Sequence, residues 1–353
     1  MAKVIVGMSG GVDSAVTAYL LKLAGFEVVG VTLRTWMSAD GKESRCCEID
    51  DARRAAYKIG IPYYALNCIM EFKNTVTDPF IEDYIKGITP NPCVICNRTV
   101  KWDKMIYTAG VMNAQYIATG HYANIVKLDN GRYTVGRAAY AGKDQTYMLY
   151  RLTQEQLSKT LMPLGNLSKE EVREIARKAR IPVAEKADSQ EICFVTNGNY
   201  AEYVETFAEC DIPPEGNFVT EDGTVVGRHK GIIHYTVGQR RGLNIAMGYP
   251  VYVKEIRAES NEVVIGPEES LFSREILVRD PNFLSIAGLS EGEKLHCKIR
   301  IRYHHAGQSG TIENDGDRIK VVFDEPVRAA APGQSAVFYD ENEYVIGGGI
   351  IDK

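Results

Sequence analysis

A short glycine-rich stretch near the start of the chain has the residue types of a phosphate-binding loop. Residues Ser9 to Ser14 read SGGVDS, between the apolar run at 4–6 and a helical pattern. Glycines let the backbone approach phosphates closely, serine hydroxyls donate hydrogen bonds, and a helix N-terminus attracts anions. Asp13 would repel a phosphate unless Mg²⁺ bridges the two, so the stretch predicts phosphates held with Mg²⁺. A plain strand-to-helix turn is the alternative, and the lysine of the common phosphate loop is missing.

Cysteines supply the second candidate chemistry. Cys93 and Cys96 lie in ITPNPCVICNR, residues 88–98, whose two prolines predict a rigid, non-helical loop before a helix from Thr99. A CxxC pair is typical of half a zinc site, a redox pair or a catalytic nucleophile. Zinc is disfavoured, because it needs four ligands and the chain has no second pair at ligand spacing. Cys193, flanked by Phe and Val, would by itself be a core residue.

Apolar periodicity predicts the elements that position these groups. Strand-like runs alternate with helical patterns, at residues 4–6, 12–23, 28–33, 49–59 and 63–66. Such alternation is typical of βαβ units and a parallel sheet. A further core strand over 116–119 ends at Gly120 and His121, and ligands of open α/β sheets bind at such carboxyl ends. A small hairpin near 125–131 and helices over 145–180 complete this part, with a capping box at 168–171.

Composition shifts near residue 197 towards short β runs. These runs lie at 218–226, 250–256, 262–265, 295–303, 308–313, 318–323, 335–340 and 343–351. We therefore predict an α/β domain over 1–197, a small β-rich central domain over 198–268 and a C-terminal β-barrel over 269–353. The central domain is the predicted RNA-binding module.

Gross composition limits the class of protein. The chain has 353 residues, a net charge of −5 and a mean hydropathy of −0.20. No apolar stretch approaches the roughly 18–20 residues of a membrane span, and no signal peptide precedes the first strand, so we expect a cytoplasmic protein without membrane contact. Eight scattered cysteines are unlike the dense framework of a small secreted domain. The net negative charge argues against general coating of nucleic acid.

Two windows without acidic residues favour a local phosphate-binding surface. The first, between Asp222 and Glu255, contains Arg228, Lys230, Arg240 and Arg241. In the second, from 294 to 310, Lys298, Arg300 and Arg302 alternate, which predicts that they share one strand face. A solvated strand face is the alternative for each window.

The motifs together resemble a known family. SGGVDS after a buried strand resembles the PP-loop ATP pyrophosphatases, which adenylate an acceptor oxygen and release pyrophosphate. NPCVICN, GHYA at 120–123, GKDQTYML at 142–149, DSQEICF and YTVGQRRGL add a resemblance to the bacterial tRNA-specific 2-thiouridylases over essentially the whole chain. It implies an N-terminal Rossmann-like domain of the adenine nucleotide alpha-hydrolase type. It also implies ATP- and Mg²⁺-dependent replacement of the 2-oxo oxygen of the tRNA wobble uridine by sulfur, with no DNA partner.

The resemblance also implies residue roles. The residues that it assigns to ATP are Gly7, Met8, Ser9, Gly10, Gly11, Val12, Asp13, Ser14, Leu33 and Gly120. Cys96 would be the nucleophile and Cys193 would carry a persulfide loaded by a donor protein, with a disulfide able to form between them. Asn91, Pro92 and Cys93 would lie near the target base. The residues that it assigns to the tRNA, through its anticodon stem-loop, are His121, Lys143, Asp144, Gln145, Arg302, Tyr303 and Gln334.

One departure leaves the sulfur chemistry open. Many family members have aspartate at the position of Cys93, so Cys93, Cys96 and Cys193 could instead hold a 4Fe–4S cluster with one open iron. Other readings are a PP-loop ligase with a small-molecule acceptor, a non-catalytic RNA-binding protein and a thiol-redox or metal-storage protein; the first two would have no use for the cysteines, and the third none for SGGVDS. Cys46 and Cys47 have no assigned role beyond buried or loop thiols.

Overall fold

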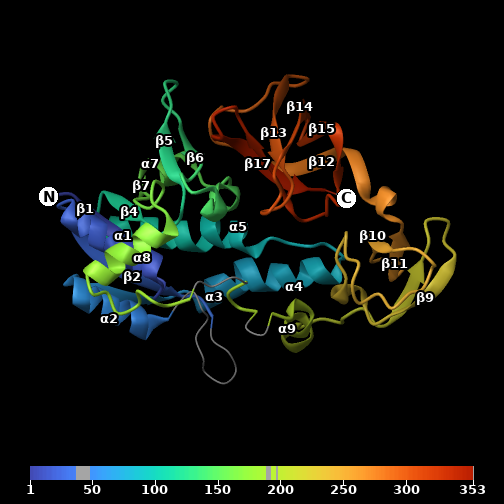
Figure 1. The fold of residues 1–353 in the computed structure, drawn as a ribbon, viewed down its shortest axis with the longest axis horizontal. Helices are drawn as coiled ribbons and strands as arrows, with labels where there is room; N and C mark the ends of the chain where they lie inside the picture. Colours follow the sequence, from blue (N-terminus) through green and yellow to red (C-terminus); the bar gives the residue numbers. More distant parts are fainter. Residues whose placement is uncertain (37–47, 188–191, 196–197, 353) are drawn as a thin grey trace.

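The computed structural model describes residues 1–36, 48–187, 192–195 and 198–352. Cys46 and Cys47, and most of the DSQEICF motif, lie outside the described residues. Figure 1 shows the N-terminal α/β domain on the left, the barrel at the upper right and the central module at the right. Among the described residues, no helix combines the length and apolar character that crossing a bilayer requires.

Five parallel strands form the N-terminal sheet, in the order β3-β2-β1-β4-β7. They are β1 (Lys3–Gly7), β2 (Glu27–Arg34), β3 (Tyr63–Asn67), β4 (Tyr116–Ala118) and β7 (Thr160–Leu161). The chain runs outward from β1 on one side through β2 and β3, and returns to place β4 on the other side. The carboxyl ends of β1 and β4 therefore flank the point where strand order reverses, which is where open α/β sheets bind ligands.

Both faces of this sheet are covered. The helices on one face are α1 (Val12–Leu23), α2 (Ile49–Ile59) and α8 (Lys169–Lys178). The elements on the other are α6 (Asp103–Val111), α7 (Gln154–Ser158) and the hairpin of β5 (Asn124–Lys127) and β6 (Tyr133–Gly136). Val4 and Val6 pack against the first set and Ile5 against the second, as the two-residue period of a strand requires. All three side chains are fully buried, which explains the continuous apolar run.

A helical arm carries the cysteine pair. Its segments are α3 (Ile69–Phe72), a π-helical turn η1 (Lys73–Thr77), α4 (Asp78–Ile85), α5 (Pro92–Cys96) and a second π-helical turn η2 (Asn97–Trp102), which leads into α6. Figure 1 shows α4 and α5 running between the α/β domain and the central module. An aromatic cluster formed by Phe72, Phe80, Phe194 and Tyr203 packs this arm against α9 (Tyr200–Phe207).

The prediction of a non-helical loop over 88–98 is wrong for its second half. Pro92 is the first residue of α5, and Asn91 before it is extended, with φ −114° and ψ 90°. Proline is tolerated at the first helical position because the N–H that it lacks would have no partner there. Pro92 therefore begins the helix that presents Cys93 and Cys96 one turn apart.

The central module is a four-stranded sheet in the order β10-β11-β8-β9. Its strands are β8 (Gly216–Val219), β9 (Val225–His229), β10 (Tyr252–Arg257) and β11 (Glu262–Gly266), with 3₁₀ turns η5 (Ile232–His234) and η6 (Glu268–Leu271). Phe218 and Tyr235 meet edge to face at 5.2 Å in its core.

The C-terminal domain is a closed barrel in the order β12-β15-β14-β13-β16-β17. Its strands are β12 (Phe272–Phe283), β13 (Lys294–Arg300), β14 (Gln308–Asp315), β15 (Arg318–Arg328), β16 (Ser335–Tyr339) and β17 (Val345–Ile351). Closure removes the exposed edges that strands present to other chains. The predicted combination of a Rossmann-like sheet, a β-rich module and a barrel is confirmed.

Two strands are absent from the sequence-based expectations. β12 alternates poorly and contains Pro281, and its pairing shifts between Ser273 and Glu275 and again between Arg279 and Asn282. β7 is two residues long and lies within 145–180, where we expected helices. That region contains the 3₁₀ turn η4 (Thr146–Met148) with α7 and α8, and a further 3₁₀ turn, η3 (Ala141–Lys143), lies just before it. The capping box at Ser168 and Glu171 is confirmed.

Phe338→Ala should destabilise the barrel strongly. The Phe338 side chain is fully buried on β16, so truncation leaves a cavity and costs about 3–5 kcal/mol of unfolding free energy. Urea unfolding followed by circular dichroism measures this loss. Phe272→Ala is the matched control, since Phe272 is 49% exposed on β12 and should cost far less. Equal losses for the two variants would contradict the assignment of Phe338 to the barrel core.

Candidate functional site

The SGGVDS loop follows β1 at the carboxyl edge of the sheet. The Ser14 hydroxyl accepts from the Ser9 backbone N–H at 3.1 Å and donates to the Gly11 carbonyl at 3.1 Å. Gly10 has φ +82°, and a Cβ there would lie 2.6 Å from the Glu48 carbonyl oxygen. Glycine is therefore required at this turn by conformation and by space. The serines predicted to hold phosphates also hold the loop in shape.

The end of β4 lies directly against the loop. A Cβ on Gly120 would be 2.8 Å from both the Asp13 carbonyl carbon and the Ser14 nitrogen, so only glycine permits this approach. Leu33, near the end of β2, packs against the two core clusters on the arm side of the sheet. The structure thus brings Gly120 against the loop, and places Leu33 on β2, the neighbour of β1 on its other side.

Asp13 has two partners that the sequence did not reveal. Lys169 Nζ contacts both carboxylate oxygens at 2.8 Å, and the Tyr122 hydroxyl donates to Oδ1 at 2.7 Å. The Lys169 side chain is only 8% exposed, and that of Asp13 30%. Burial of an ammonium is costly unless it is paired, so the two charges stabilise each other. The loop itself contains no lysine, but the ammonium of Lys169, 156 residues further along the chain, contacts its aspartate.

Lys169 lies inside the capping-box motif at 168–171, from which we predicted only the start of a helix. Ser168 and Glu171 form the capping box of α8, and Lys169 is the first residue of that helix. Its backbone position is therefore set by the cap, which orients the side chain towards α1. A second lysine, Lys186, contacts the Gly10 carbonyl at 3.3 Å and pairs with Asp51 on α2. Burial lowers the pKa of Lys186.

Asp13 fits the Mg²⁺ role by its chemistry and position. Its carboxylate lies at the start of α1 beside the loop and remains partly exposed, and carboxylates are ligands that Mg²⁺ prefers. Lys169 contacts both oxygens, so a bound metal would share the carboxylate with this ammonium or displace it.

Cys96 and Cys193 belong to one buried cluster. Cys96 is 5% exposed and packs with Phe194, while the half-buried Cys193 contacts the same cluster. Leu33 and Leu66, near the ends of β2 and β3, also pack against it. The cysteine helix therefore lies on the side of the sheet where the strands have their carboxyl ends, as the phosphate loop does.

Cys93 lies close enough to Tyr303 to interact with it electrostatically. Cys93 is half-buried, and its charge contributes to the raised pKa of Tyr303, although burial of Tyr303 is the larger cause. Across the described residues, no three His, Cys, Asp or Glu side chains converge in an arrangement that could hold a metal ion. Cys93, Cys96 and Cys193 therefore do not form a preorganised cluster site in this structure.

His121 lies between the loop region and the arm. Its Nδ1 is 2.9 Å from the Thr119 hydroxyl, and its ring packs on Trp102 at 5.3 Å between centroids. Burial, with a smaller effect of the Lys101 charge, lowers the pKa of His121 to about 3. The residue is therefore neutral at physiological pH, so any contact with RNA would be a hydrogen bond or stacking.

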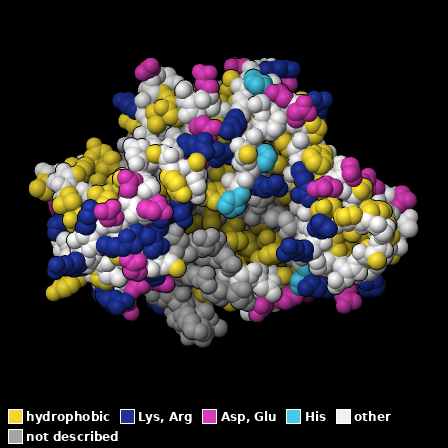
Figure 2. Space-filling view, viewed as in Figure 1, with side chains coloured by type: hydrophobic (Ala, Val, Ile, Leu, Met, Phe, Trp, Pro, Cys, Tyr) yellow, Lys and Arg dark blue, Asp and Glu magenta, His cyan; other side chains and the backbone are white. Residues whose placement is uncertain are grey.

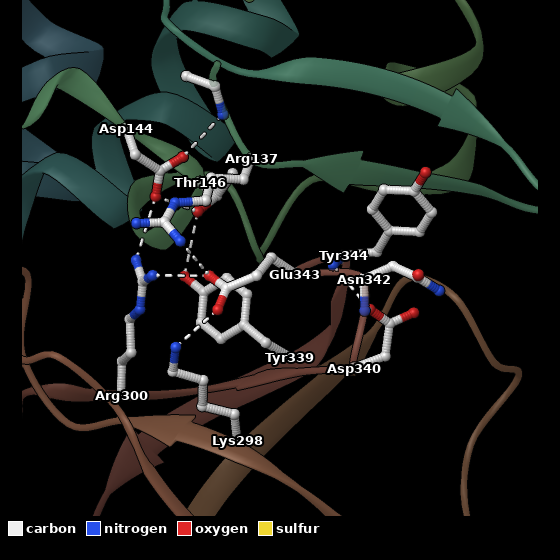
Figure 3. A network of polar contacts seen from close by, with 11 residues as sticks. Arg137, Asp144, Thr146, Lys298, Arg300, Tyr339, Asp340, Asn342, Glu343 and Tyr344 are labelled. Atoms are coloured by element: carbon white, nitrogen blue, oxygen red, sulfur yellow. Dashed lines mark hydrogen bonds and ion pairs between the residues drawn. The ribbon is translucent and has the colours of Figure 1, made fainter. Parts of the chain in front are cut away.

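The other residues predicted to contact tRNA fall into two groups. Arg302 is exposed, and Lys143, Gln145 and Tyr303 are half-buried. Three of the predicted residues make side-chain hydrogen bonds within the protein: Asp144, Gln334 and also Gln145, whose side-chain oxygen accepts from the Tyr122 N–H at 2.9 Å. Asp144 is 7% exposed and pairs with Arg300 at 3.1 Å, as Figure 3 shows, and the Gln334 amide donates to the Thr89 carbonyl at 2.9 Å.

The basic residues of the first acid-free window are exposed, whereas two residues of the second window are engaged inside the protein. Arg228, Lys230, Arg240 and Arg241 are all exposed on the central module. Arg300 is 7% exposed and, with Lys298, pairs with Glu343 inside a polar network (Figure 3). The charge of a buried guanidinium between two carboxylates is balanced by them, and its N–H groups are not available to bind a phosphate. Figure 2 shows Lys and Arg side chains along the rim of a hollow near the middle of the molecule.

Three family models match consecutive parts of the chain. They are described as the tRNA methyl transferase HUP domain over 2–197, the tRNA methyl transferase PRC-barrel domain over 205–267 and the Aminomethyltransferase beta-barrel domain over 273–351. A relative in Lachnoclostridium phytofermentans, named tRNA-specific 2-thiouridylase MnmA, is 51% identical, with 100% of both chains covered. The protein of the same name in Clostridioides difficile is 48% identical, over 99% of this chain and 98% of that one.

The chain belongs to the tRNA-specific 2-thiouridylase family. The match extends over essentially the full length of this chain and of the relatives, and the expected family resemblance is confirmed. Among solved structures, the U34-tRNA thiolase NcsA from Methanococcus maripaludis with its [4Fe-4S] cluster is similar over 60% of this chain and 75% of that chain. The identity is 18% and the TM-score 0.36, values that add nothing to the family assignment.

Lys169→Met should weaken binding of Mg²⁺-ATP about tenfold or more, because a charged partner of the only loop carboxylate is lost. Isothermal titration calorimetry without tRNA measures this. Lys178→Met is the matched control on the same helix, since Lys178 pairs with Glu174 at an exposed position. Unchanged ATP affinity in Lys169→Met would show that Lys169 serves the fold alone.

His121 should make stability depend on pH. The unfolded chain takes up a proton near the ordinary pKa of 6.5 and the folded chain only near 3, so folding loses stability as pH falls from 6.5 towards 3. His121→Gln should flatten this dependence in urea unfolding measured at several pH values. His296→Gln, at an exposed position on β13, is the control for loss of a histidine. A variant that keeps the parental slope would contradict the lowered pKa.

Proposed function

We propose that this protein replaces the 2-oxo oxygen of the wobble uridine of tRNA by sulfur, after activating that oxygen with ATP. Membership of the tRNA-specific 2-thiouridylase family supports the reaction class, a tRNA uridine sulfurtransferase of the PP-loop type. The observation that carries the proposal is the position of two chemistries at one sheet edge. The phosphate loop follows β1, and Cys96 packs with Leu33 and Leu66 near the ends of β2 and β3.

Adenylation is the step that the phosphate loop would serve. The residues that would hold ATP are Gly7, Met8, Ser9, Gly10, Gly11, Val12, Asp13 and Ser14, with Leu33 and Gly120 flanking the nucleotide. Asp13 would hold Mg²⁺, which supplies positive charge beside the departing pyrophosphate. The N-terminus of α1 adds backbone N–H donors and the positive end of its dipole. The uridine oxygen would attack the α-phosphorus, and the bond to pyrophosphate would break.

Sulfur transfer needs both cysteines if a persulfide is the source. The terminal sulfur of a Cys193 persulfide would form the bond to C2, and the bond from C2 to the AMP oxygen would break. The Cys96 thiolate would then attack Cys193 Sγ, and the electron pair of the persulfide bond would stay with the sulfur on C2. The products are 2-thiouridine, AMP and a Cys96–Cys193 disulfide, which a thiol reductant would reopen before a donor protein reloads Cys193.

Shared burial supports this pairing of roles. The buried Cys96 and the half-buried Cys193 contact one apolar cluster built from the arm and α9, which would limit the access of water to a persulfide there. The first turn of α5 would lie beside the target base through Asn91, Pro92 and Cys93. The contacts proposed for the anticodon stem-loop are His121, Lys143, Gln145, Arg302 and Tyr303, together with the exposed arginines and lysine of the central module.

Cys93 keeps a second sulfur source open. A 4Fe–4S cluster on Cys93, Cys96 and Cys193 could deliver sulfide instead, although the described cysteines do not converge on one point. Anaerobic purification with iron analysis separates the two sources. Colourless, iron-free protein with full activity would exclude the cluster, and activity that follows iron content would exclude the persulfide route.

Incubation with ATP, a persulfide-loaded donor protein and transcribed tRNA, followed by nucleoside mass spectrometry, tests the proposal. We expect 2-thiouridine from the unchanged protein and none from Cys96→Ala or Cys193→Ala, because each removes a sulfur that the reaction needs. Both variants should bind tRNA as the parent does. Cys210→Ala is the matched control, since Cys210 is exposed and outside the buried cluster. Thiolated product from either cysteine variant would remove the role given to that cysteine.

A further inference from the structure

The segment just before the cysteine helix is held by the barrel. The Thr89 N–H donates to the Pro332 carbonyl at 2.9 Å, and the Gln334 side-chain amide donates to the Thr89 carbonyl at 2.9 Å. Between these barrel residues, Gly333 has φ +90°, and a Cβ there would lie 2.3 Å from the Ile88 side chain and 2.8 Å from the Thr89 carbonyl oxygen. The barrel thus grips the two residues that precede Pro90 and Asn91.

The residue just after the cysteine helix is held by a loop of the α/β domain. Asn97 is 2% exposed, and its side-chain amide donates to the Met148 carbonyl at 3.0 Å. The Asn91 amide, at the start of the helix, contacts the sulfur of the same Met148 at 3.6 Å. One residue of this loop therefore contacts both ends of α5, on either side of Cys93 and Cys96.

That loop is in turn fixed to the barrel. Arg300 on β13 donates to Asp144 at 3.1 Å, the Thr146 hydroxyl lies 3.2 Å from the Tyr339 hydroxyl on β16, and Tyr147 donates to the Ser335 carbonyl at 2.8 Å. Figure 3 shows Asp144 and Thr146 from the α/β domain facing these barrel strands. Thr146 and Tyr147 are fully buried, so water cannot replace the bonds that they make.

A carboxylate of the barrel completes the charge balance. Glu343 accepts from Arg300 and Arg137 at 3.0 Å and from Lys298 at 2.6 Å. Burial alone would raise the pKa of Glu343, but the hydrogen bond from Lys298 and the nearby positive charges hold that pKa below its ordinary value. Glu343 therefore stays ionised, and Asp144 is one of the two carboxylates that the buried Arg300 needs.

We infer that the C-terminal barrel clamps the cysteine helix, with Asp144 and Gln334 as positioning residues for Cys96. The inference rests on the proposed role of Cys96 in sulfur transfer. Gln334 restrains the segment before α5, and Asp144 restrains, through Thr146 and Met148, the residue after it. A displacement of about 1 Å in a reacting group can cost a hundredfold in rate, so this restraint bears directly on the sulfur step.

Two variants, Asp144→Asn and Gln334→Leu, test the clamp in the full-length protein. Each removes one restraint, so Cys96 should become accessible and its rate of alkylation, followed by mass spectrometry, should rise several-fold. The exposed Cys210 should be labelled at the parental rate in the same sample. The kcat for thiolation should fall roughly tenfold, with the KM and Kd for tRNA unchanged, because positioning and not binding is lost.

Arg132→Ala is the matched control. Arg132 also joins the α/β domain to the barrel, donating to the Leu284 carbonyl at 2.8 Å and the Phe283 carbonyl at 3.0 Å, but it contacts neither the Met148 loop nor the Thr89 segment. It should lower stability to a similar extent and leave Cys96 labelling and kcat unchanged.

The outcomes separate the clamp from the proposed function. Unchanged Cys96 labelling with a weakened tRNA Kd in Asp144→Asn or Gln334→Leu would overturn the clamp and restore the RNA contact. A rise in Cys96 labelling in Arg132→Ala equal to that in the two variants would also overturn it, since any loosened interface would then suffice. Faster Cys96 labelling in the two variants than in the parent, together with a parent that makes no 2-thiouridine, would support the clamp while contradicting the proposed function.

Discussion

The close contact between the end of β4 and the start of α1 is the constraint on which the site depends. Gly120 leaves no room for a side chain against the Asp13 and Ser14 backbone, so the phosphate loop and the residues after β4 share one small volume. That contact places Tyr122 within hydrogen-bonding distance of Asp13. The parallel sheet supplies the reason, because the strand order reverses at β1 and opens a crevice there.

The charge of Asp13 also determines where α8 must lie, because this helix carries the lysine that pairs with it. A loop that contains an aspartate but no lysine has the wrong charge for phosphates, and Lys169 corrects it from the first position of a capped helix. Both charges are largely removed from water, so each depends on the other. The same rule governs the barrel interface, where Arg300 lies between Asp144 and Glu343. In both places a buried ion pair joins segments that are more than 40 residues apart in the chain.

The barrel is therefore part of the catalytic domain's architecture as well as a separate fold. It contacts the segment before α5 directly. It also binds the loop of the α/β domain that holds Asn97, the residue after α5. Residues that look like RNA contacts in the sequence, such as Asp144 and Gln334, have their polar groups directed at the protein. Exposure separates them from Arg302, which follows β13 of the barrel and faces solvent.

Local patterns in the sequence determined the elements near the loop: the buried strand over 4–6, the helix that follows SGGVDS and the capping box at Ser168 each depend on neighbouring residues. The motifs likewise determined the family, and with it the kind of chemistry. Only the tertiary structure decided that Pro92 begins a helix, that β12 closes a barrel, that Lys169 meets Asp13 and that Arg300 is buried. These features arise from contacts between distant segments, and the energy of burying a charge or closing a sheet has no signature in a local stretch of residues.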